Sequence, residues 1–181
     1  GQADVVIASG SKGASPGAWI PPCRALNAWR NNSMMNDTRT DMSPEHENSR
    51  TVLLVHAHPE PTSFTRHLVT VAGETLAGQG HTVLQSDLYA MQWKAVFDAD
   101  DFPQRLDRQR LSFIDESRHA YAHGRQTADV EAEQAKLQAA DAVILVFPLW
   151  WFGMPAIMKG WIERVWSYAV SYTHLRAHET G

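Results

Sequence analysis

The sequence has little of several features that would point to other classes of protein. It contains one cysteine, Cys23, so no disulfide can form within the chain, which fits a reducing compartment. No apolar run approaches the roughly 18 to 20 residues that span a bilayer, and no basic region followed by an apolar core indicates a signal peptide. The formal net charge is -4 and the basic residues do not cluster, so no feature supports nucleic-acid binding. We therefore expect a soluble, cytoplasmic protein without membrane insertion and without a nucleic-acid partner.

The 181 residues are enough for one ordinary domain, but the first part of the chain does not look like part of it. Residues 1–49 carry clusters of Gly, Ser, Asn and Pro and few periodic apolar positions. Such a segment cannot bury enough surface to offset its chain entropy, so we expect a disordered leader. Met34 and Met35 leave open that residues 1–33 are translated upstream sequence rather than native protein.

From residue 51 onward, strand patterns alternate with helix patterns. Apolar or β-prone runs predict strands at residues 51–55, 81–88 and 142–147. Apolar spacing predicts helices at residues 64–80, 104–122 and 129–139 and after Pro155. The side of the first helix predicted to be buried carries Phe64, Leu68, Val71, Ala72 and Leu76. Strands joined by helical crossovers predict an open, doubly wound α/β sheet, for which we expect the strand order 2-1-3.

This strand order has a consequence for the strand at residues 142–147. The strand would form an exposed edge that is entirely apolar, where natural proteins place charge or a bulge. We therefore expect it to need a fourth strand beside it, and we expect the chain alone to be poorly soluble.

The loop after the first strand offers groups that suit a phosphate. His58, Thr62, Ser63 and Thr65 lie where the first helix begins, and Thr62 or Ser63 is a plausible N-cap. Unpaired N–H groups and partial positive charge at a helix N-terminus favour a phosphate or pyrophosphate. The alternative is that these hydroxyls only cap the helix.

The loop after the third strand is rich in aromatic residues. Trp150, Trp151 and Phe152 occupy a short turn between Pro148 and the following helix. Large flat rings there suit the isoalloxazine of a flavin, whereas the alternative is that both tryptophans belong to the core. The order 2-1-3 would bring both loops to the point where the strand order reverses, the position at which FMN binds in flavodoxin-like sheets.

Other candidate sites are weaker, and no metal site is predicted. The sequence has neither G-x-G-x-x-G nor a Walker lysine. His56 and His58 lie two residues apart without a third ligand nearby, and His119 and His123 lie four apart without the H-E-x-x-H arrangement. The acidic residues at 129–133 fit a solvated helix start.

Three strings resemble a known family when they are taken together. VHAHPEPTSFTRHL, SDLYAMQW and DVEAEQAKLQAADAVILVFPLWWFGMPAIMKGWIERVW, within residues 50–166, are similar to segments of the flavodoxin-like NAD(P)H:quinone oxidoreductases, which include DT-diaphorase and the modulator-of-drug-activity enzymes. The resemblance implies a flavodoxin-like fold, FAD as cofactor with FMN as the alternative, NAD(P)H as co-substrate, a quinone or other small-molecule acceptor, two-electron ping-pong hydride transfer and a homodimer. The cofactor contacts that it and the loop chemistry imply are His58, Thr62, Ser63, Phe64, Thr65, Pro148, Leu149, Trp150, Trp151, Phe152 and Gly153. Thr65 departs from the asparagine that is frequent in the family.

The chain departs from the family after Trp166. Family members continue with further strands that carry the Tyr and His acting on the reduced flavin, so no catalytic residue is assigned here. We expect residues 50–168 to be the N-terminal part of the domain and 169–181 to be an unstructured tail, because YTHLRAHET resembles a translated adapter sequence. The expected function is a quinone reductase, present as a fragment that is inactive alone. The alternative is a regulatory flavoprotein subunit of a potassium-efflux system.

Overall fold

A four-stranded sheet organises the chain in a computed structural model that describes residues 3–8 and 49–166. The strand order is β1-β4-β2-β3, and β2 pairs in parallel with both β3 and β4. The three parallel strands therefore have the predicted order 2-1-3. The strands are β1 (Ala3–Ala8), β2 (Thr51–His56), β3 (Thr82–Asp87) and β4 (Ala142–Pro148).

The structure corrects the expectation that all of residues 1–49 are disordered, because β1 lies within that segment. It pairs antiparallel with β4, in a register that sets Ala3 opposite Pro148 and Ala8 opposite Val143. The apolar edge that was predicted to need a fourth strand therefore has one, supplied by the N-terminal segment. Residues 9–48 and the expected tail at 169–181 lie outside the described residues.

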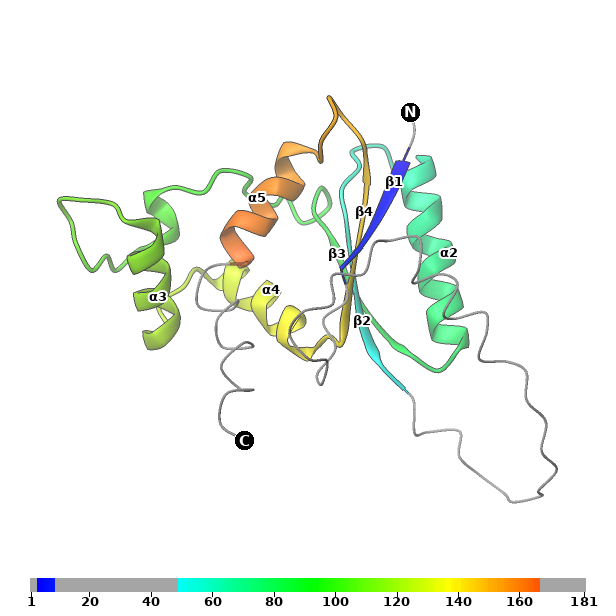
Figure 1. The fold of residues 1–181 in the computed structure, drawn as a ribbon, viewed down its shortest axis with the longest axis horizontal. Helices are drawn as coiled ribbons and strands as arrows, with labels where there is room; N and C mark the ends of the chain where they lie inside the picture. Colours follow the sequence, from blue (N-terminus) through cyan, green and yellow to red (C-terminus); the bar gives the residue numbers. More distant parts are fainter. Residues whose placement is uncertain (1–2, 9–48, 167–181) are drawn as a thin grey trace, which may run out of the picture.

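Helices cover both faces of the sheet (Figure 1). One face packs against α2, and the other packs against α4 and α5, while α3 lies farther from the sheet, beyond them (Figure 1). Chain order places a short 3-10 helix, η1, before α3. The helices are α2 (Phe64–Gly78), η1 (Ala99–Asp101), α3 (Phe113–His123), α4 (Ala128–Ala139) and α5 (Ala156–Val165).

Two predictions about helices were wrong in detail. The buried side of α2 matches the prediction in part, because Leu68, Ala72 and Leu76 pack against the core as expected. Phe64 and Val71 are exposed instead, and the most buried residues of the helix are Thr65 and Val69. Helix α3 begins only at Phe113, because the preceding residues form a loop whose backbone N–H groups bond to the buried Glu116 carboxylate. The N–H groups of Leu106 and Asp107 therefore have an acceptor although these residues are not helical.

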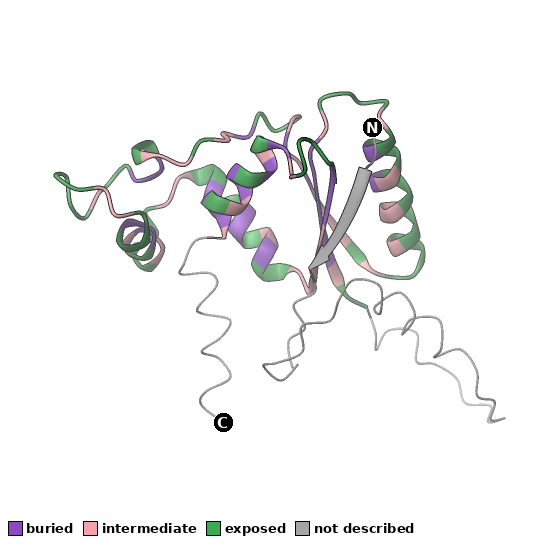
Figure 2. Ribbon diagram, turned by 45° about the horizontal axis from the view of Figure 1, so that its top comes forward, coloured by how far each residue is buried: buried purple, intermediate pink, exposed green. Residues whose placement is uncertain are grey.

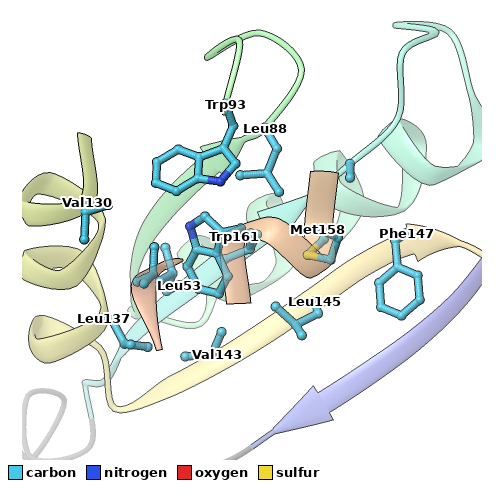
Figure 3. Packing of buried hydrophobic residues seen from close by; sticks show 13 residues of the cluster. Leu53, Leu88, Trp93, Val130, Leu137, Val143, Leu145, Phe147, Met158 and Trp161 are labelled. Carbon is cyan, nitrogen blue, oxygen red and sulfur yellow. The ribbon is translucent and has the colours of Figure 1, made fainter. Parts of the chain in front are cut away.

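The main core lies between the sheet and the helices α4 and α5. Figure 2 shows that buried residues concentrate in the strands and in these two helices. Trp161 of α5 is fully buried and, as Figure 3 shows, lies among residues from the sheet and from the connection that follows β3. The cluster includes Leu53, Leu88, Trp93, Val143, Leu145, Met158 and Val165.

Buried ionic groups tie the connection after β3 to this core. The Arg164 guanidinium donates to Asp101 (Nε to Oδ1, 2.6 Å), to Asp129 (Nη2 to Oδ2, 2.7 Å) and to the Lys94 carbonyl oxygen (3.1 Å). It also lies over the Trp93 ring, 4.5 Å from the ring centroid. One buried cation thus joins α5, α4 and the connection, which fixes the elements on this face of the sheet.

Within residues 3–8 and 49–166, no helix is both long enough and apolar enough to cross a membrane.

Candidate functional site

The two loops predicted to bind a ligand lie side by side at one edge of the sheet. They follow the carboxyl ends of the parallel strands β2 and β4, and both lie at the top of the view in Figure 1. The ring of His58 in the first loop and that of Trp150 in the second have centroids 6.1 Å apart and meet edge to face at 61°. The strand order therefore brings together side chains that are about ninety residues apart in sequence.

The second loop is a tight turn that holds two rings out in solvent. Trp150 and Gly153 exchange backbone hydrogen bonds of 2.9 and 3.0 Å, so Trp151 and Phe152 form the two corners. Both corner residues have positive φ, 50° and 63°, as the central residues of a type I′ turn do. Such angles are unusual for bulky residues. The Trp151 and Phe152 side chains are nevertheless 96% and 94% exposed.

Exposed apolar rings on a strained turn carry two costs that packing within the chain does not offset. The left-handed backbone is unfavourable for residues with bulky side chains, and the ring surfaces remain in contact with water. Strained backbone of this kind concentrates at ligand sites, where the surrounding structure holds it in place. The geometry therefore favours a flat ligand against these rings over the core alternative.

The first loop ends in a helix start with free backbone donors. Ser63, one of the two predicted candidates, is the N-cap of α2, and its Oγ accepts from the Arg66 N–H at 3.2 Å. The N–H groups of Phe64 and Thr65 have no acceptor in the part of the chain that the structure describes. These donors and the helix dipole make this end of α2 suitable for an anion.

Glu60 occupies the centre of the first loop. Its Oε1 accepts from the Thr62 N–H at 3.0 Å and from the Thr62 hydroxyl at 2.7 Å. Its own N–H donates to His58 Nδ1 at 3.0 Å, and its carbonyl oxygen accepts from the Ser63 N–H at 3.2 Å. The hydrogen bonds from Thr62 hold the pKa of the Glu60 carboxyl below its ordinary value. Glu60 was not among the predicted site residues, although a carboxylate two residues before a Thr-Ser pair could have suggested it.

A second polar cluster lies beside the first loop, on the α2 side of the sheet. His56 at the end of β2 is only 2% exposed, and its Nε2 lies 3.9 Å from an Asp87 carboxylate oxygen and has no hydrogen-bond partner among the described residues. Asp87 also receives a short hydrogen bond from the Arg66 guanidinium. Burial lowers the pKa of His56, against the opposing effect of Asp87.

The other predicted site residues differ in accessibility. His58 and Ser63 are half-buried, Thr62 and Phe64 are exposed, and Thr65 is buried. In the second loop, Pro148 is buried as the last residue of β4, while Leu149 and Trp150 are exposed. Gly153 is half-buried at the base of the turn. The rings of His58 and Trp150 contact each other across the two loops, and the Thr65 side chain is buried.

A separate cavity of about 600 Å³ lies between α3 and the loop before it. Its lining includes Asp107, Arg110, Asp115, His119 and His123. His119 and His123 stack with centroids 4.3 Å apart, and within residues 3–8 and 49–166 no group of three or more His, Cys, Asp or Glu side chains could hold a metal. The start of α3, with its N-cap Ser112, contributes to the lining, but the positive-φ turn with its exposed aromatic rings at 151 and 152 is not part of this cavity. The two loops therefore remain the better candidate site.

Comparison with known proteins adds a family and several relatives. The profile of a family described as having the flavodoxin-like fold matches residues 50–181. The ribosyldihydronicotinamide dehydrogenase-like protein traD of Penicillium crustosum is 52% identical over 67% of this chain and 45% of its own length. NAD(P)H dehydrogenase [quinone] 1 of Rattus norvegicus is 43% identical over 73% of this chain and 48% of its own length.

Solved structures agree with this assignment. A Klebsiella pneumoniae protein provisionally described as a quinone reductase superposes with a TM-score of 0.64 at 52% identity, covering 66% of this chain and 46% of its own. An NAD(P)H:quinone oxidoreductase from Methanothermobacter marburgensis superposes with a TM-score of 0.54 at 30% identity, covering 67% and 55%. The chain spans about half the length of the curated relatives that it matches. None of the relatives named here is a regulatory subunit of a potassium-efflux system.

Proposed function

This chain belongs to the family with the flavodoxin-like fold, and from that premise we propose that it supplies the flavin-binding part of an NAD(P)H:quinone oxidoreductase. The proposed cofactor is FAD, with NAD(P)H as electron donor and a quinone as acceptor. The relatives named as quinone dehydrogenases and ribosyldihydronicotinamide dehydrogenases support this reaction class.

One observation carries the proposal for the cofactor. A turn that holds Trp151 and Phe152 out in solvent lies next to a helix start with free N–H donors, in contact through His58 and Trp150. A flavin dinucleotide needs both surfaces, because its ring system is flat and largely apolar on its faces while its pyrophosphate carries negative charge. Neither surface alone would distinguish a flavin from other ligands.

The donor set fits such a group. The backbone N–H groups of Phe64 and Thr65 and the side chains of Thr62, Ser63 and His58 would hold the pyrophosphate. The rings of Trp151 and Phe152, with Leu149 and Trp150 beside them, would cover the isoalloxazine and exclude water from it. When bound, the flavin supplies the hydride chemistry, and the chain contributes binding and orientation.

No described residue is assigned a catalytic role in this proposal. We expect the assembled enzyme to be a homodimer. The exposed aromatic turn is compatible with such an assembly, since a second subunit could cover the outer faces of Trp151 and Phe152.

The proposal is tested by titrating the purified chain with FAD and following flavin fluorescence. Loss of one stacking ring in Trp151→Ala should weaken binding roughly three- to tenfold. Leu106→Ala is the matched control, because this exposed apolar residue lies in the loop before α3, away from the site. Equal affinities of the chain and both variants, or no binding by any of them, would contradict the proposal.

A further inference from the structure

The first loop contains a carboxylate, that of Glu60, which already accepts hydrogen bonds from donors of the same loop. Both donors of Thr62, its N–H and its hydroxyl, point to one oxygen of the Glu60 carboxylate, at 3.0 and 2.7 Å. The Glu60 backbone also engages its neighbours, because its N–H donates to His58 Nδ1 and its carbonyl oxygen accepts from the Ser63 N–H. Two of the side chains proposed to hold a pyrophosphate, those of Thr62 and His58, therefore contact Glu60, and Ser63 contacts it through its backbone N–H.

The contacts of Thr62 cannot be shared with a phosphate at full strength. A hydroxyl has one proton to donate, and the backbone N–H has one as well. A phosphate oxygen that accepts from Thr62 must take the place of Glu60 Oε1. A carboxylate left close by would repel the phosphate, since like charges at short range disfavour one another.

We propose that Glu60 is an internal competitor for the anion-binding end of α2, which a phosphate must displace before it can accept hydrogen bonds from Thr62. This inference rests on the proposed function, because it concerns the same loop and the same cofactor. Glu60 therefore lowers the affinity for FAD and leaves the affinity for an uncharged flavin unaffected, so it narrows the preference of the site for phosphate-bearing flavins.

The exposure of Glu60 makes the exchange feasible. The side chain lies on the surface, so it can move into solvent without leaving a cavity or an unpaired buried group. The donors of Phe64 and Thr65 remain available in the same helix turn and would receive the phosphate first. The lowered pKa of Glu60 shows that the contact with Thr62 favours the charged form, which is the form that competes with an anion.

The experiment compares FAD with riboflavin, which carries the same ring system without phosphate. Dissociation constants are measured by fluorescence titration for the unaltered chain, Glu60→Gln, Glu60→Ala and the control Glu74→Gln, which removes an exposed charge from the middle of α2. Both changes at Glu60 should tighten FAD binding roughly two- to fivefold, the range expected for one exposed charge contact. Riboflavin affinity and the Glu74→Gln variant should not change.

The gain should also depend on Thr62. In a Thr62→Val background, which removes the hydroxyl, Glu60→Gln should improve FAD affinity by a smaller factor, because the two residues compete through a shared contact. If the unaltered chain binds FAD and the Glu60 variants bind it no better, the proposed competition by Glu60 is refuted, whereas the proposed flavin site is not. If no form of the chain binds FAD or riboflavin, the proposed function is refuted and this inference with it.

Discussion

Glu133 offers a strong test of how the core is held together, since it is a carboxylate with only 1% of its surface exposed. It accepts from Ser86 Oγ of β3 at 2.7 Å, from Trp161 Nε1 of α5 at 2.8 Å and from Lys136 Nζ of its own helix at 2.6 Å. A single side chain on α4 thus joins the sheet to both helices on this face.

Replacing Glu133 by alanine should lower the free energy of unfolding by about 2 to 6 kcal/mol, the combined cost of two buried donors that lose their acceptor. The Trp161 N–H and the Ser86 hydroxyl proton would lose their acceptor, at about 1 to 3 kcal/mol for each buried group. Lys136 is partly exposed and can turn to water, so it adds little.

Urea denaturation at neutral pH measures the effect directly. Glu133→Gln keeps an acceptor oxygen and should therefore cost less than the alanine change. Glu131→Ala is the matched control, because Glu131 lies on the same helix but is exposed, and it should change stability by less than about 0.5 kcal/mol. An alanine variant at 133 that is as stable as the one at 131 would show that these three hydrogen bonds do not hold the layers together.

Three further predictions concern packing at Gly160, the pH dependence of stability and hydrogen exchange in the loop before α3. Gly160→Ala should destabilise the chain by about 1 to 3 kcal/mol in thermal or urea unfolding, because a Cβ at this position would lie 2.0 Å from the Ala95 carbonyl oxygen. This steric cost should exceed the gain from the better helix propensity of alanine. A more stable variant would refute the close contact. Burial lowers the pKa of His56 in the folded chain, so as pH falls the unfolded chain takes up this proton at a higher pH than the folded chain does. The free energy of unfolding should therefore decrease as pH falls below about 6.5. His56→Leu should flatten that part of the pH–stability curve, and an unchanged slope would contradict it. Glu116→Gln should accelerate hydrogen exchange at the Leu106 and Asp107 amides, which now bond to its carboxylate, and unchanged rates would mean that other contacts hold the loop.

Much of the sheet could be predicted from sequence because its strands are short apolar runs bounded by clear turn residues. Right-handed crossovers limit the possible topologies to a few, and the parallel pairing of β2 with β4 brings the two loops to one edge. An N-cap at Thr62 or Ser63 also follows from local rules, since it depends on the residue types where the helix begins.

The remaining features depend on contacts between distant residues. No local pattern indicates that Ala3–Ala8 pairs with β4, because the pairing depends on an apolar edge far along the chain. The late start of α3 depends on Glu116 bonding to the backbone of the preceding loop, which no periodicity reveals. The positive φ values of Trp151 and Phe152 could not be foreseen either, because the sequence around them has glycine only at the end of the turn.

The most direct test of the central claim is an NMR titration of the isotopically labelled chain with FAD, followed through its backbone amide shifts. The account predicts that amides in residues 58–65 and 149–153 shift together and with the same saturation, because one ligand contacts both loops. Shifts confined to one loop, or shifts around the cavity beside α3 instead, would contradict the claim that the two loops form a single flavin site.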